Sequence, residues 1–222
     1  MGEMIKLTTK DGATIGAYKA EPANKPRGGI VVLQEIFGVN RHIRKVADGF
    51  AAAGYLAIAP ALFDRVAPGV DLGYEQDDIK EGVDIRAGTK FEDTLADIEA
   101  AIAVAAQAGR VGVVGYCWGG TLAYAAAVHL QGIAAAVAYY GSGIAAMRRE
   151  TLLAPVEFHF GERDKSIPPE DVEKIRAAHP DSALYIYPAD HGFSCDERPS
   201  YDEASAALAR SRTLEFFAHH IG

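Results

Sequence analysis

The sequence predicts a single α/β domain, residues 1–222, in which helices cover both faces of a mostly parallel sheet. Three observations support this fold class. Short apolar runs of strand length alternate with helical segments from residue 28 onward, a pattern that is typical of parallel sheets. A length of 222 residues is enough to bury one sizeable core. No internal repeat, low-complexity tract or linker divides the chain.

The elements are expected in the following order. Asp11-Gly12 is a hairpin signal between two strands at the start of the chain. Further strands are expected at 28–33, 55–59, 111–114, 132–140, 155–160 and 183–187, and helices at 40–53, 94–108, 121–130, 169–178 and 201–219. Ser200 and Glu203 have the spacing of a capping box for the last helix. Residues 62–90 are irregular, predict at best a short helix near 75–81, and are expected to cap the active site without forming a large lid.

Cys117 is the most informative residue. It lies in residues 115–120, Gly-Tyr-Cys-Trp-Gly-Gly, directly after the apolar run 111–114. The strained strand-to-helix turn of α/β-hydrolases needs small residues two before and two after its nucleophile. That turn exposes the nucleophile at a helix N-terminus, where the dipole favours a thiolate. The pattern therefore predicts an α/β-hydrolase fold with cysteine as the nucleophile.

The partners of the thiol are expected at the ends of later strands. Asp164 follows the strand at 155–160, and His191 follows the strand at 183–187. The order nucleophile, acid, base is the order of this fold's hydrolases. His191 would accept the thiol proton, and Asp164 would orient the imidazole. We expect the oxyanion to bind the backbone N–H groups of Trp118 and Ile36.

Four segments together resemble the dienelactone hydrolase (carboxymethylenebutenolidase) family. They are residues 34–40 (Gln-Glu-Ile-Phe-Gly-Val-Asn), the turn at 115–120, Tyr139-Tyr140-Gly141, and residues 190–193 (Asp-His-Gly-Phe). The resemblance covers nearly the whole chain. It implies ring opening of a dienelactone to maleylacetate, with no metal or organic cofactor.

By this resemblance Cys117, Asp164 and His191 form the triad, and Glu35 is a fourth functional residue. A carboxylate beside a thiol disfavours the thiolate. The hypothesis is that Glu35 keeps Cys117 protonated until a substrate carboxylate displaces it, whereupon Glu35 takes the proton. The alternative is that Glu35 only caps the helix near Asn40.

An anionic substrate needs cationic partners. Arg198 is the expected substrate-binding arginine, with Phe37 and Tyr139 as apolar walls of the pocket. Lys80 and Arg86 are further candidates in the irregular segment.

Composition limits the remaining function classes. The formal net charge of −8 comes from 22 basic and 30 acidic residues without a basic patch, so nucleic acid is not an expected partner. No apolar run reaches the length of a membrane span or signal peptide. Two cysteines outside a disulfide-rich frame fit a reducing cytoplasm. A monomer or small homo-oligomer is expected.

Three other interpretations stay open. The same triad would serve a broad carboxylesterase or thioesterase. The fold could also be a binding module without catalysis, although the complete triad argues against this. Finally, Cys117 and Cys195 could form a redox pair, but the chain has no Cys-x-x-Cys motif.

Overall fold

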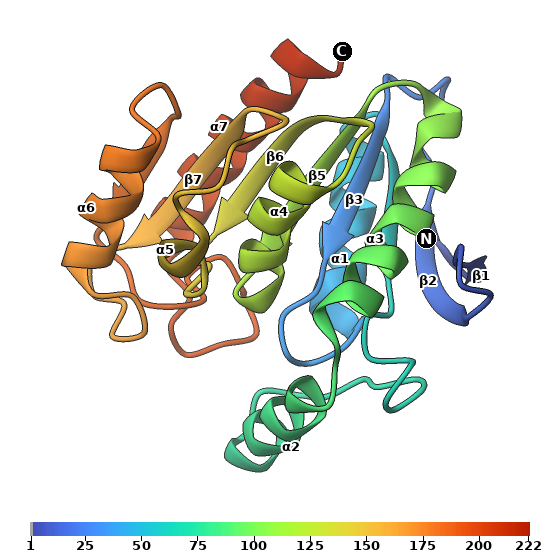
Figure 1. Cartoon of the computed structure of the whole chain (residues 1–222), viewed down its shortest axis with the longest axis horizontal. Coiled ribbons are helices and arrows are strands. Elements are labelled where there is room, and N and C mark those ends of the chain that lie inside the picture. Colours follow the sequence, from blue (N-terminus) through green and yellow to red (C-terminus); the bar gives the residue numbers. More distant parts are fainter. Residues whose placement is uncertain (1) are drawn as a thin grey trace.

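The computed structural model describes residues 2–222, which form one eight-stranded sheet with helices on both faces (Figure 1). The strand order is β1-β2-β4-β3-β5-β6-β7-β8. β2 runs antiparallel to both of its neighbours, and the strands from β3 to β8 are parallel. The strands are β1 Glu3–Thr8, β2 Thr14–Ala20, β3 Gly29–Leu33, β4 Leu56–Pro60, β5 Val111–Tyr116, β6 Ile133–Tyr139, β7 Val156–Gly161 and β8 Leu184–Tyr187.

The helices form two layers. α1 and α7 pack on one face of the sheet, whereas α3 and α4 pack on the other, next to the short α5 and α6 (Figure 1). The helices are α1 Arg41–Ala52, α2 Gln76–Ala87, α3 Phe91–Ala105, α4 Trp118–His129, α5 Ile144–Met147, α6 Pro169–Ala178 and α7 Glu203–His220, with a 3₁₀ turn at Ala106–Ala108. The predicted fold class is therefore confirmed. None of the helices in residues 2–222 combines the length and the apolar character needed to cross a membrane.

The central strands are buried on both faces because helices cover both. All residues of β3, β4, β5 and β7 are buried, which explains the continuous apolar sequence of the first three. The hairpin at Asp11-Gly12 is confirmed by the antiparallel pairing of β1 with β2. Asn40 is the N-cap of α1, and its side chain accepts a hydrogen bond from the backbone N–H of Ile43.

Three local predictions differ from the structure. α2 is a full helix of 12 residues, longer than the short one expected. α4 begins at Trp118, directly after the nucleophile, rather than at residue 121. The capping box at Ser200 is wrong, because Asp202 caps α7 by accepting a hydrogen bond from the Ser205 N–H at 2.8 Å.

The loops that carry the predicted site share the carboxyl-terminal edge of the parallel sheet. The loops after β3, β5, β7 and β8 all leave this edge, and α2 lies beyond it (Figure 1). A small second cluster of buried side chains, Ile36, Phe37 and Phe63, packs beneath α2. α2 therefore covers the region beside the nucleophile as a short cap.

Candidate active site

Cys117 sits on a strained turn between β5 and α4. Its backbone has φ 57° and ψ −115°, a conformation that L residues rarely adopt and that is concentrated at functional sites. A Cβ at Gly115 would lie 1.8 Å from the Gly119 carbonyl oxygen, and one at Gly119 would lie 2.3 Å from that of Leu33. Both glycines are required by close backbone packing, as the motif predicts. The half-buried thiol of Cys117 is thereby presented at the N-terminus of α4.

The structure brings His191 and Asp164 together. His191 Nδ1 donates a hydrogen bond to Asp164 Oδ2 at 2.7 Å, and the Asp164 side chain is fully buried. The other carboxylate oxygen accepts the backbone N–H of Ser166 at 2.8 Å. Burial disfavours the charged ring, but the hydrogen bonds to Asp164 and Cys117 outweigh it and raise the pKa of His191 to about 10. His191 thus lies between the carboxylate and the thiol, and its raised pKa favours transfer of the thiol proton to Nε2.

Two backbone N–H groups are available near the thiol. Trp118 is the first residue of α4, so its N–H has no partner within the helix. Within residues 2–222, the N–H of Ile36 donates to no protein acceptor. Both belong to loops at the same edge of the sheet, which is consistent with the predicted oxyanion hole.

Glu35 is buried beside two donors. Its side chain is only 1% exposed. Arg198 Nη1 donates to Oε1 at 3.1 Å, and the Tyr74 hydroxyl donates to Oε2 at 3.1 Å. The interpretation of Glu35 as a helix cap has no support, because Asn40 caps α1. Burial and then the charge of Glu35 raise the pKa of Tyr74, which keeps its hydroxyl protonated as a donor.

Arg198 lies within reach of the predicted pocket. Its guanidinium carbon is 5.9 Å from the centre of the Phe37 ring and 5.8 Å from that of Tyr74. Burial opposes its charge most strongly, but Glu35 together with Tyr140 and the two cysteines outweighs burial, and the pKa of Arg198 is raised. Lys80 and Arg86 instead lie exposed on α2. Arg198 is therefore the cation that the structure brings to Glu35.

Tyr139 differs from its expected place in the substrate pocket. The side chain is buried, its ring stacks on that of His159 with centroids 4.4 Å apart, and its hydroxyl shares a 2.7 Å hydrogen bond with Thr213 of α7. The expectation is corrected: Tyr139 belongs to the core between the sheet and α7. Its backbone still supports the turn, because its carbonyl accepts the Cys117 N–H at 3.1 Å.

Comparison with known proteins identifies the family. The model of the dienelactone hydrolase family matches residues 15–221, nearly the whole chain. This chain belongs to the dienelactone hydrolase family. It is therefore a hydrolase with the α/β-hydrolase fold, as the sequence predicts.

Individual members of the dienelactone hydrolase family are similar to this chain over nearly its full length. The carboxymethylenebutenolidase of Pseudomonas putida is 34% identical over 97% of this chain and 96% of its own. A Synechocystis protein provisionally named carboxymethylenebutenolidase is 38% identical over 91% of each chain. The crystal structure of a Klebsiella pneumoniae protein, provisionally named a dienelactone hydrolase, has a TM-score of 0.84 at 34% identity, covering 98% of this chain and 99% of its own.

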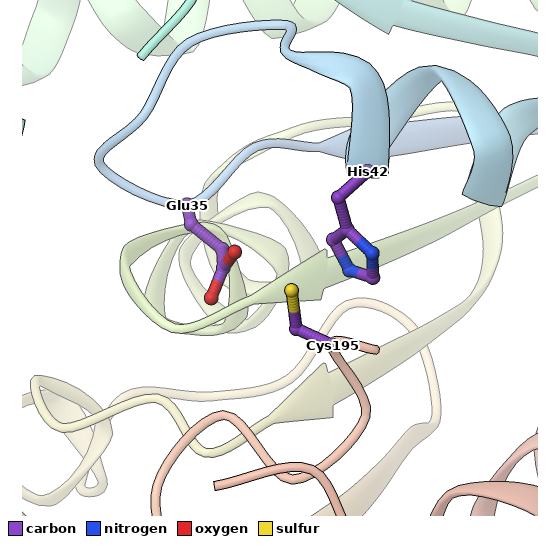
Figure 2. Close-up of side chains that lie close together, drawn as sticks. All are labelled: Glu35, His42 and Cys195. Atoms are coloured by element: carbon purple, nitrogen blue, oxygen red, sulfur yellow. The ribbon is translucent and has the colours of Figure 1, made fainter. Parts of the chain in front are cut away.

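In this dienelactone hydrolase family member, sequence reasoning missed the hydrogen bond from Tyr74 to Glu35 and the positions of His42 and Cys195. His42 is buried beside Glu35 and Cys195 (Figure 2). Burial, and then the charge of Glu35, raise the pKa of Cys195 to about 12. Both cysteines are free, so the structure contains no Cys117–Cys195 disulfide among the described residues. No local motif marks the three residues, since they come from separate loops and a helix.

Proposed function

We propose that the chain hydrolyses a small lactone or ester bearing a carboxylate, through an acyl-enzyme on Cys117. The observation that carries this proposal is the placement of His191, which is bonded to buried Asp164 and interacts with the thiol on the strained turn. Only a nucleophilic mechanism uses all three groups in this order.

Acylation begins when His191 Nε2 takes the thiol proton and Cys117 Sγ attacks the carbonyl carbon. The N–H groups of Trp118 and Ile36 stabilise the oxyanion, and each such donor is worth about 3 kcal/mol in the transition state. When the tetrahedral intermediate collapses, the ester oxygen leaves and takes the proton from His191. In a lactone this step opens the ring while the leaving oxygen stays attached to the acyl group.

Deacylation repeats the same steps with water. His191 removes a proton from water, which attacks the thioester carbon, and the proton then returns to the Cys117 sulfur as the thiol leaves. The product is a new carboxylate. Asp164 remains ionised throughout and holds the imidazole ring in orientation.

The pair of Glu35 and Arg198 supports an anionic substrate. Arg198 is bonded to Glu35 at 3.1 Å in a site closed by Phe37 and Tyr74. A substrate carboxylate would take the guanidinium, because arginine binds planar carboxylates in a bidentate manner. Glu35, released from Arg198, would then accept the proton of Cys117 in place of His191, and His191, whose raised pKa favours a protonated ring, would supply the proton for the leaving oxygen. The similarity to the carboxymethylenebutenolidase of Pseudomonas putida supports a dienelactone as this substrate.

The test compares a dienelactone carboxylate with a neutral aryl acetate. Cys117→Ala should lose hydrolysis of both substrates. Arg198→Gln should lower kcat/KM for the dienelactone by about 10- to 100-fold, because a hydrogen bond to a charged group contributes about 1.5–3 kcal/mol, and should change aryl acetate hydrolysis much less. Lys80→Gln, which changes an exposed cation on α2, is the matched control.

Equal effects of Arg198→Gln on both substrates would contradict the anionic substrate and favour a broad carboxylesterase or thioesterase. Full activity of Cys117→Ala would contradict the mechanism itself. A cytoplasmic location and a monomer or small homo-oligomer stay predictions, which cell fractionation and size-exclusion chromatography can check.

A further inference from the structure

Three potential metal ligands converge beside the proposed active site. One ligand atom each from Glu35, His42 and Cys195 lies within 4.8 Å of the other two, and all three residues are buried. Figure 2 shows the side chains of His42 and Cys195 pointing toward each other, with Glu35 beside them. They come from the loop after β3, the first turn of α1 and the loop after β8, so only the folded chain assembles them.

His42 has no partner for either ring nitrogen. The residue is 3% exposed, and both Nδ1 and Nε2 are buried without a hydrogen bond. Buried polar groups in folded proteins are almost always paired, so an unpaired one needs an explanation. A ligand on His42 would supply the missing partner. Nδ1 faces the Asp196 carboxylate at 3.6 Å, which leaves Nε2 for the cluster.

The donor set is the one that zinc prefers. Imidazole nitrogen, thiolate sulfur and carboxylate oxygen are all zinc ligands, and three protein ligands leave a fourth position open. Metal-bound histidines commonly donate their second N–H to a carboxylate, and Asp196 stands where that partner is needed. In a tetrahedral site the ligand atoms are about 3.5 Å apart, so small side-chain movements would close the cluster.

A groove adjoins this position at His42, although Glu35 and Cys195 do not line it. It lies between α1 and α7, has a volume of about 470 Å³, and is lined by His42, Lys45, Ser194 and Asp196 among others. None of the triad residues lines it. The side of His42 that borders the groove is therefore separate from the nucleophile.

We propose that Glu35, His42 and Cys195 bind a zinc ion, which holds Glu35 in place and thereby inhibits hydrolysis reversibly. The binding site stands on the geometry alone, whereas the inhibition rests on the proposed function of Glu35. When the Zn–S bond forms, the thiol proton of Cys195 leaves to solvent. The Glu35 carboxylate already accepts from Arg198 and Tyr74, and its remaining lone pairs can bind the ion.

The charges near the site are compatible with a bound zinc ion. The carboxylate of Glu35 and the thiolate of Cys195 together balance the two charges of the ion. Arg198 contacts Glu35, so it meets a neutral cluster rather than a bare cation. Once both groups hold the ion, Glu35 cannot leave Arg198 to take the proton of Cys117.

The binding test uses Cys117→Ala protein, so its outcome does not depend on hydrolysis. Cobalt(II), a spectroscopic substitute for zinc, is titrated in and the sulfur-to-cobalt charge-transfer band is recorded, followed by displacement with zinc. We expect the band in Cys117→Ala and its loss in Cys117→Ala/Cys195→Ser. His42→Gln in the same background should weaken binding by about 100-fold or more, whereas substitution of the exposed His129 by Gln should not.

If the proteins with the additional Cys195→Ser or His42→Gln substitution unfold, X-ray absorption of zinc-loaded Cys117→Ala still tests the binding site. One sulfur ligand at about 2.3 Å from the zinc is expected. Absence of the cobalt band or of the sulfur ligand in Cys117→Ala would overturn the site. The inhibition is tested separately on protein with Cys117 intact. Zinc should inhibit hydrolysis of the dienelactone carboxylate, whose turnover needs the release of Glu35, and Cys195→Ser should need at least about 10-fold more zinc. Equal inhibition of wild type and Cys195→Ser would place the inhibitory ion on Cys117. That result would overturn the proposed inhibition but not the proposed binding site.

Discussion

Two histidine–carboxylate pairs lie near neighbouring strands and have opposite properties. His159 Nε2 is 2.9 Å from Glu157 Oε1 within β7, and His191 Nδ1 is 2.7 Å from Asp164 Oδ2 in the loops beyond β7 and β8. Burial lowers the pKa of His159. Burial also opposes the charge of His191, yet Asp164 and Cys117 raise its pKa to about 10. Similar spacing of the two pairs therefore does not lead to the same chemistry.

The difference lies in what the second ring nitrogen contacts. His159 is fully buried, and its Nδ1 is 2.8 Å from the Tyr187 hydroxyl, which in turn accepts from Arg212 at 3.1 Å. The lowered pKa of His159 favours a neutral ring, and because the Glu157 carboxylate can only accept, Nε2–H donates to it and Nδ1 accepts from the Tyr187 hydroxyl. His191 has only one such structural bond, and its second nitrogen is left for the thiol. A closed network fixes a structural histidine, whereas an incomplete one leaves a base free to act.

The largest predicted effect is on kcat and distinguishes the carboxylate of Asp164 from that of Glu157. Asp164→Asn should lower kcat by about 10⁴-fold, because the neighbouring imidazole loses its orientation and the stabilisation of its charge. Glu157→Gln should leave kcat within about 3-fold, since an effect beyond that would need over about 0.6 kcal/mol of lost transition-state binding. Steady-state hydrolysis of an aryl acetate measures both. Similar losses in the two variants would mean that the pairs are not functionally distinct.

The second prediction concerns stability, to which Glu157 should contribute although it matters little for activity. Glu157→Ala leaves the Nε2–H of His159 buried without this acceptor, and we expect the free energy of unfolding to fall by about 1–3 kcal/mol. Urea denaturation monitored by circular dichroism measures the change. Glu162→Ala, which alters an exposed carboxylate just after β7, is the control. An unchanged midpoint for Glu157→Ala would contradict a structural role for the pair.

The third prediction concerns pH. The pKa of His191 in the folded protein, about 10, is above its ordinary value of 6.5. The folded state therefore binds a proton that the unfolded state releases, so this contribution is complete below pH 6.5 and is lost as pH rises toward 10. Unfolding free energy should fall across this window by at most about 1.4 kcal/mol per pH unit, and His191→Gln should reduce the slope.

His159 provides the opposite control for that experiment. Its lowered pKa means that the folded state binds the proton less well, so its stability contribution is present above pH 6.5 and declines as pH falls through the acid range. His159→Gln should therefore flatten the acid side of the stability profile and leave the alkaline side intact. Equal slopes of wild type and His191→Gln between pH 7 and 10 would contradict the assignment.

The smallest predicted effect comes from one hydroxyl of the closed network. Tyr187→Phe removes the donor to His159 Nδ1 and should lower the free energy of unfolding by about 1 kcal/mol. Aryl acetate hydrolysis should be unchanged. Tyr201→Phe, which alters an exposed ring, is the matched control in thermal melts. A loss of activity without a loss of stability would argue that His159 takes part in catalysis.

Much of the site could be predicted because its signals are local. The turn at Cys117 requires glycine at positions 115 and 119, where a Cβ would strike backbone. Asp164 and His191 follow strands that the apolar pattern identifies. Parallel strands then place these residues at one edge of the sheet. Local sequence and sheet topology are therefore sufficient to locate the triad.

What could not be predicted depends on contacts between distant segments. The approach of His42 and Cys195 is set by how α1 packs against the loop after β8, and no sequence spacing records it. Tyr139 was misplaced because strand alternation does not say which face of β6 meets α7. The glycines in residues 62–90 interrupt the helical sequence pattern, so the full length of α2 could not be predicted. One of them, Gly82, is required by packing, because a Cβ there would lie 2.1 Å from the Ile36 carbonyl oxygen.

Trapping the acyl-enzyme is the most direct test of nucleophilic catalysis by Cys117. Wild-type protein is mixed with a slowly hydrolysed aryl ester and quenched in acid, and its intact and peptide masses are measured. We expect one acyl group, as a thioester on Cys117, that accumulates in His191→Gln more slowly than in wild type and never in Cys117→Ala. Turnover by Cys117→Ala, or an acyl group on another residue of the active wild type, would contradict it.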